Sequence, residues 1–181
     1  MRIQTFLLPI VALSLVGAGC NPIENLKEKA MNGIVDKAIE HTVKTQTGKD
    51  VDVNIKDGGM QVTGEDGANF AMGENLKLPD NFPSDIPVYG SVSIKSSSID
   101  TKKGSVFLIM SSKDKAEDIV AWYKEQAKAK GWTQKSSLEM SEGNYIVSFE
   151  NKDKATFAIT ITQGEDEEET GITLTRSETQ Q

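Results

Sequence analysis

The sequence predicts an α+β fold in which one α-helix covers an antiparallel β-sheet, preceded by an amphipathic helix and a small β-meander. The first observation is an alternation of apolar and mostly polar residues at 145–149, 157–162 and 172–175, typical of strands with one covered face. The second is a single helical pattern at 116–127, which lies between earlier and later strands. The third is that polar turns separate neighbouring strands.

The N-terminal part is expected to contain one helix and a meander. Apolar residues recur at spacings of three and four from residue 22 to residue 46, which predicts a helix. We expect its apolar face to pack on the protein's own sheet; a face turned towards a partner or a bilayer is the alternative. Two alternating strands follow at 51–56 and 60–63, with a short third strand at 69–72. The pattern leaves open whether this meander joins the later sheet.

A stiff connector is predicted between the meander and the main sheet. Prolines at positions 79, 83 and 87 remove amide donors and favour extended backbone. The apolar residues expected to pin this connector to the core are Phe82, Ile86 and Tyr89.

The C-terminal part is expected to begin with strands at 91–95 and 105–110, of which the second is apolar on both sides, as in a central strand. Ser111 and Asp114 have the spacing of a capping box, so we expect the helix to open there and to end at Gly131. A further strand is expected to start near Trp132. The residues predicted to form the buried face of the helix are Ala116, Ile119, Val120, Tyr123 and Ala127, with Trp122 at its margin.

The sequence contains one cysteine, Cys20, directly after an uncharged apolar run at 3–19. A helix needs about 20 apolar residues to cross a bilayer, so this run is marginal, and Pro9 interrupts it. Arg2 precedes the run and the small residues 17–19 end it, which is typical of a signal peptide.

This arrangement resembles the lipobox of bacterial lipoproteins, although Gly17 stands where leucine is usual. The resemblance implies removal of residues 1–19 and acylation of Cys20, for example with palmitate, as a firm membrane anchor. Ordinary cleavage after Gly19 and an uncleaved anchor are the alternatives. Asn21 is not the aspartate of an inner-membrane retention signal, so in a Gram-negative cell the implied location is the periplasmic face of the outer membrane.

The net charge disfavours two kinds of binding partner, and the single cysteine leaves no internal disulfide bond to stabilise the fold. The chain has a formal charge of −7, and loss of residues 1–19 removes one base and no acid, giving 19 bases, 27 acids and a charge of −8. This balance disfavours nucleic acids and electrostatic adhesion to anionic lipids. With its single cysteine acylated, the exported chain would have no internal disulfide, so its apolar core must hold the fold.

Two motifs resemble a group of uncharacterised bacterial envelope lipoproteins and secreted proteins. They are Leu78-Pro79 with Phe82-Pro83-Ser84-Asp85-Ile86-Pro87-Val88-Tyr89, and Trp122-Tyr123-Lys124 with Lys130-Gly131-Trp132. The resemblance implies a fold and a location rather than an activity. The expected organisation is a signal peptide (1–19), a lipid-anchored, lipid-proximal helix (20–48), the β-meander (49–75), the Pro-rich connector (76–90) and the α+β domain (91–181).

Few side chains in this sequence suggest catalysis. His41 is the only histidine, so a Ser-His-Asp device would have to use it, and no serine lies in a nucleophile-elbow sequence. The usual zinc site needs three or four Cys, His or carboxylate ligands, which this chain cannot supply in the usual combination. We therefore expect no catalytic, cofactor-binding or metal-binding residues and no cofactor. The acidic run at 165–169 is interpreted as a solvated loop, with a cation or basic-partner site as the alternative. Trp122, Tyr123 and Trp132 are interpreted as core residues rather than a sugar-stacking or membrane-interface surface.

The sequence therefore predicts a membrane-anchored bacterial envelope lipoprotein that is not an enzyme and acts as a binding or scaffolding module for another envelope component. A small envelope hydrolase and an inhibitor or immunity-type protein are the alternatives. An enzyme would gather His41 with a serine or acids in a pocket. A binding module would instead expose an apolar or aromatic patch.

Overall fold

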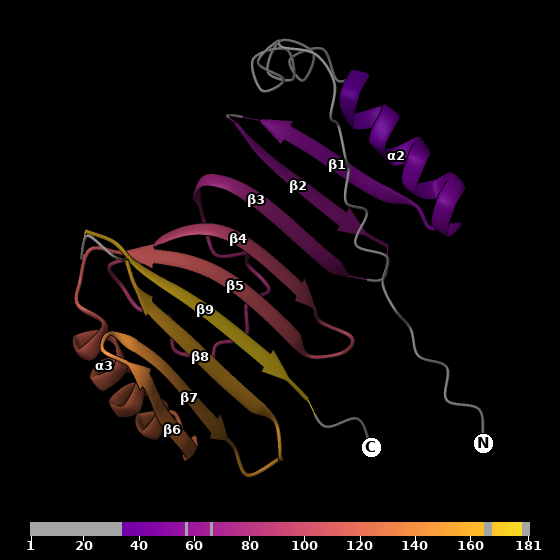
Figure 1. Ribbon diagram of the computed structural model, residues 1–181. Coiled ribbons are helices and arrows are strands. Elements are labelled where there is room, and N and C mark those ends of the chain that lie inside the picture. The colour runs from indigo at the N-terminus through magenta and orange to yellow at the C-terminus, as the bar shows by residue number, and fades with distance from the viewer. Residues whose placement is uncertain (1–33, 57, 66, 165–167, 179–181) are drawn as a thin grey trace.

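The computed structural model describes residues 34–56, 58–65, 67–164 and 168–178, and its main feature is one large antiparallel sheet. Within these residues nine strands form that sheet, and helices lie near its two ends (Figure 1). The α+β class expected from the sequence is thus confirmed. No helix in the described ranges is long and apolar enough to span a bilayer.

The N-terminal elements are α2 (Ile34–Thr47), β1 (Val51–Lys56), β2 (Gly59–Gly64) and β3 (Ala68–Leu76). Helix α2 contacts β1, and the Glu40 carboxylate accepts a hydrogen bond from the Val53 amide at 3.1 Å. In the described part this helix therefore packs on the protein's own sheet, as expected. The first turns of the predicted helix, residues 22–33, lie outside the described residues.

The C-terminal elements are β4 (Ser93–Asp100), β5 (Ser105–Ser112), α3 (Ala116–Ala129), β6 (Thr133–Ser141), β7 (Asn144–Glu150), β8 (Thr156–Gln163) and β9 (Thr170–Ser177). The strand order is β1-β2-β3-β4-β5-β9-β8-β7-β6, so β5 is the central strand, as predicted. Strand β3 pairs with β4 through Ala71 and Ser97, among other pairs. The meander therefore extends the main sheet, which answers the question that the sequence left open.

Helix α3 lies beside the β6–β8 end of the sheet (Figure 1). Its buried residues are those predicted from the sequence, Ala116, Ile119, Val120, Tyr123 and Ala127, while Trp122 is half-buried. The C-terminal stop is also as predicted, because Gly131 has a φ of +83°, which glycine adopts readily.

The predicted capping box does not form. Ser111 and Ser112 belong to β5, and α3 begins one residue after Lys115, whose side chain makes no capping hydrogen bond. The amide of Ala116 instead donates to the Gln163 side-chain oxygen at 3.1 Å. The capping group of α3 therefore comes from Gln163 on β8. Because Gln163 is distant in sequence, the spacing of residues around the start of the helix cannot reveal it.

The connector between β3 and β4 is pinned to the core as expected. Ile86 is buried, and Phe82 and Tyr89 pack against the core. The Trp132 indole donates to the Asp85 carbonyl at 2.8 Å, which fixes the middle of the connector.

The two ends of the sheet differ in polarity on the face that α3 covers, here called the inner face. Directly paired residues share one face of a sheet, so a row of pairs can be followed across all the strands. From β7 to β1 one inner-face row is Val147, Ile159, Leu174, Leu108, Ser97, Ala71, Gln61 and Asn54. The row is apolar and buried up to β5 and then becomes polar, so α3 covers the apolar end and leaves the polar end open.

Candidate functional site

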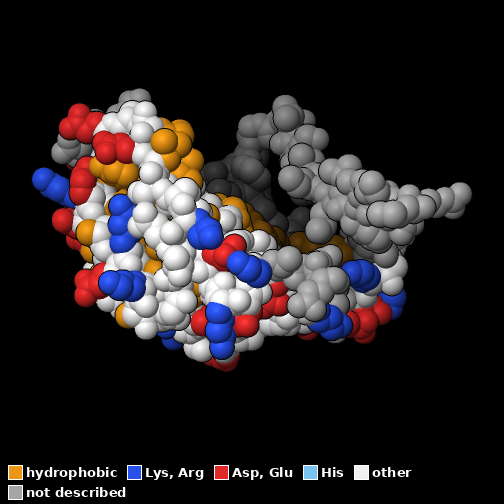
Figure 2. Space-filling model, turned by 90° about the horizontal axis from the view of Figure 1, so that it is seen from below, with side chains coloured by type: hydrophobic (Ala, Val, Ile, Leu, Met, Phe, Trp, Pro, Cys, Tyr) orange, Lys and Arg blue, Asp and Glu red, His pale blue; other side chains and the backbone are white. Residues whose placement is uncertain are grey.

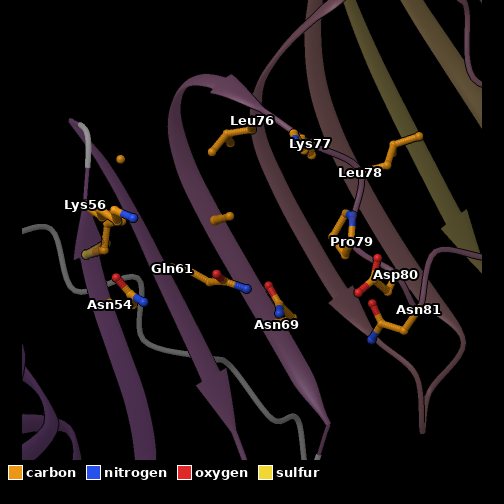
Figure 3. Close-up of a pocket in the computed structure, with 13 residues that line it drawn as sticks. Asn54, Lys56, Gln61, Asn69, Leu76, Lys77, Leu78, Pro79, Asp80 and Asn81 are labelled. Carbon is orange, nitrogen blue, oxygen red and sulfur yellow. The ribbon is translucent and has the colours of Figure 1, made fainter.

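A pocket of about 530 Å³ lies over the polar end of the inner face. This volume falls within the range of about 300–1,000 Å³ that is usual for small-molecule sites. Its floor includes the carboxamides of Asn54, Gln61 and Asn69, from β1, β2 and β3, together with Ala71 (Figure 3). Its rim is the start of the connector, residues 76–81. We call the three side chains of Asn54, Gln61 and Asn69 the carboxamide row.

Strand alternation explains why these amides share a face. In β1, Val53 and Ile55 flank Asn54, and successive side chains of a strand point to opposite sides. Asn54 pairs directly with Gln61, and Gln61 pairs with Ala71, two residues from Asn69. The carboxamide row therefore crosses three neighbouring strands, which lie about 4.8 Å apart from strand to strand.

Two buried polar atoms in or beside the pocket have no hydrogen-bond partner within the described residues. They are Oδ1 of Asn69, which lines the pocket, and Oγ of Ser97, whose residue is 1% exposed and pairs with Ala71. A buried polar group without a partner costs about 1–3 kcal/mol. Both atoms have almost no exposed surface, so a molecule in the pocket would reach them only after a movement of the side chains.

Three charged side chains line the pocket beside the neutral carboxamide row. Lys56 lies on the same face of β1 as Asn54, and Lys77 and Asp80 belong to the connector; all three are exposed. No histidine, cysteine or serine is among the described lining residues, so no nucleophile stands beside a base there. The arrangement provides donors and acceptors for binding a neutral ligand rather than groups for covalent chemistry.

Sequence reasoning missed the carboxamide row. The alternation at 51–56 and 60–63 predicts strands with one apolar face, but nothing in one sequence aligns three strands. The available signal is one carboxamide side chain in each of these strands, Asn54, Gln61 and Asn69. That signal becomes meaningful only once the register is known.

The residues that the sequence singled out lie away from the pocket. His41 is exposed on α2, and the structure does not bring it into the pocket. Cys20 and three residues of the acidic run, 165–167, lie outside the described residues, while Glu168 and Glu169 are exposed. In the described ranges no group of three or more His, Cys, Asp or Glu side chains is placed to hold a metal ion.

The aromatic residues pack in the core, as interpreted from the sequence. Trp122 makes edge contacts with Tyr89 and Tyr123 at 5.1 Å between ring centres, and Trp132 contacts Phe157 at 4.8 Å. Burial raises the pKa of Tyr123, and burial together with the hydrogen bond to Asp114 raises the pKa of Tyr89. Both phenols therefore stay neutral and structural at ordinary pH.

The opposite, outer face of the sheet carries an apolar patch, formed by Phe70, Met72, Phe107 and Ile109. These side chains are 36–47% exposed. The pairings Phe70–Ser98–Phe107 and Met72–Ser96–Ile109 place them in two neighbouring rows across β3, β4 and β5. Hydrophobic side chains also gather along a hollowed side of the molecule in the space-filling view (Figure 2). Exposed apolar patches of this kind are typical of interaction surfaces.

Comparison with known proteins gives one match. A family model described as START domain-like matches residues 91–171, less than half of the chain, which cover β4, β5, α3, β6, β7, β8 and the start of β9. No curated protein and no solved structure matches. The match is compatible with a non-catalytic ligand-binding module. The carboxamide row lies outside the matched residues, so over its C-terminal part the chain is similar to START domain-like proteins, while its pocket is built by the strands that precede them.

Proposed function

We propose that this protein is a lipid-anchored bacterial envelope lipoprotein whose folded part is a non-catalytic module that binds a small ligand in the pocket described above. The observation that carries the proposal is the pocket itself, with a neutral carboxamide row on its floor. The START domain-like similarity of residues 91–171 supports a ligand-binding role for the fold.

A binding role fits the residues better than the alternative of a small hydrolase. Hydrolysis by a serine device requires a base within hydrogen-bond reach of a nucleophile. Among the residues that the structure describes, the pocket lining contains one carboxylate, Asp80, and no hydroxyl nucleophile, and His41 lies elsewhere, on α2. The pocket can therefore position and hold a molecule, and we propose that the protein has no enzymatic activity.

The proposed anchor is the thiol of Cys20. The lipobox-like run at 3–19 supports acylation at this residue, and the two motifs shared with envelope lipoproteins support the same location. An acyl anchor contributes about 0.8 kcal/mol per buried methylene group, so two or more chains hold a protein stably on a membrane. The ligand-binding module would then work at the exported side of a membrane.

The anchor is tested by replacing Cys20 with serine. We expect Cys20→Ser to remove fatty-acid labelling and to move the protein from the membrane to the soluble fraction of fractionated cells, because a hydroxyl is not acylated by the lipoprotein pathway. Ser14→Ala, inside the same apolar run, is the matched control and should stay labelled and membrane-bound. An unlabelled parent protein would contradict the proposed anchor.

Ligand binding is tested by nuclear magnetic resonance on the full-length, ¹⁵N-labelled protein in a detergent without a sugar headgroup. The side-chain NH₂ signals of Asn54, Gln61 and Asn69 report on the pocket directly. We expect at least one class from a panel of free amino acids, short peptides, nucleosides, organic acids and oligosaccharides to shift these signals at millimolar concentration, which corresponds to about 4 kcal/mol of binding free energy. If none of the panel shifts them, the proposed function is wrong.

A further inference from the structure

We infer that the ligand of this pocket is a hydroxyl-rich, uncharged molecule of the saccharide class. This inference rests on the proposed function and specifies the chemistry of the same site. It is drawn from the donors and acceptors of the carboxamide row, from the exposure of the charged lining residues, and from the pairing of the strands that form the floor.

Each side chain of the carboxamide row offers both donors and an acceptor of hydrogen bonds. Each Asn or Gln side chain carries two N–H donors and one carbonyl acceptor, and each sugar hydroxyl likewise donates one hydrogen bond and accepts others. Asn54 and Gln61 are directly paired on β1 and β2, whereas Asn69 on β3 is offset by two residues from Ala71, the partner of Gln61. The step from Gln61 to Asn69 is therefore a diagonal of about 7–8 Å. A ligand that carries several hydroxyl groups and lies obliquely across the strands can meet all three carboxamides.

Anions, peptides and lipids fit the same pocket less well. An anion is held best by desolvated cations, but Lys56 and Lys77 are exposed and share the pocket with the carboxylate of Asp80. A peptide strand would require free backbone groups, but β2 and β3 are each paired on both sides. An apolar chain would leave the carboxamide row without partners, which costs free energy for each desolvated amide.

The test uses two probes, tetra-N-acetylchitotetraose and maltotetraose, with the full-length labelled protein described above. We expect at least one of them to shift the side-chain NH₂ signals of Asn54, Gln61 and Asn69. We further expect Gln61→Leu to weaken that binding about tenfold, the loss that follows from removing about one hydrogen-bonded group. Gln61 is exposed, so its replacement should leave the fold intact.

The matched control is Gln134→Leu, an equally exposed glutamine on β6 that lies outside the pocket, and it should bind the sugar as the parent does. Shifts caused by amino acids, peptides or nucleosides but by neither oligosaccharide would overturn the saccharide class and leave the proposed function standing. Shifts caused by no probe would overturn both. Equal weakening by Gln61→Leu and Gln134→Leu would show that the sugar binds elsewhere and would overturn the inference.

Discussion

Replacement of Ile119 by aspartate is expected to unfold the sheet region that α3 covers. Ile119 has no exposed surface and lies in the centre of the buried face of the helix, within the core cluster. The change removes a buried apolar side chain and places a carboxylate where it has no designed partner, which is among the most destabilising of single substitutions. We expect a loss of about 4 kcal/mol or more, and of roughly 10 °C or more in Tm.

The control for this prediction is Ala121→Asp, which places the same charge on the same helix at an exposed position. Its cost should be limited to helix propensity, less than about 1 kcal/mol. Thermal unfolding followed by circular dichroism compares the two variants with the parent. An unchanged Tm for Ile119→Asp would contradict the assignment of the buried face of α3.

The second large effect is expected for Phe157→Ala. The Phe157 ring is 1% exposed, stacks on Phe149 with 4.5 Å between ring centres, and takes an edge contact from Trp132 at 4.8 Å. Truncation removes the transfer free energy of the ring and leaves a cavity between two large neighbours, which together cost about 3–5 kcal/mol. Urea unfolding followed by tryptophan fluorescence measures this loss and also reports on the changed surroundings of Trp132.

The matched control is Phe107→Ala on the opposite face of the sheet, where the side chain is 39% exposed. Because that ring is only partly desolvated and no element of the described residues stacks on it, we expect a cost of about 1 kcal/mol. If the two variants lose equal stability, the distinction between a covered inner face and an open outer face is wrong.

The sequence predicted the elements whose pattern is local. Alternation at 157–162 and at 172–175 identified β8 and β9, because one face of each strand is buried and the other is not. The spacing of Ile119, Val120 and Tyr123 identified the buried face of α3 for the same reason. These assignments need only the contrast between buried and solvated positions along one element.

Elements whose residues are exposed on both sides were harder to predict. Strand β6 (Thr133–Ser141) was expected only as a strand starting near Trp132, because every one of its residues is exposed and carries no alternation. It forms the last strand at one end of the sheet, with irregular pairing to β7 near Lys135 and Met140. Its position is set by hydrogen bonds to β7 rather than by its own apolar pattern.

The sequence by itself determined the α+β class and the buried face of α3, while acylation of Cys20 stays a prediction. Each of these depends on the order of apolar and polar residues along a short stretch. The tertiary structure alone decided that the meander extends the main sheet and that Asn54, Gln61 and Asn69 form one row under the connector. The physical reason is that strand register is a relation between segments distant in sequence, and the polarity of a face emerges only when the strands are aligned.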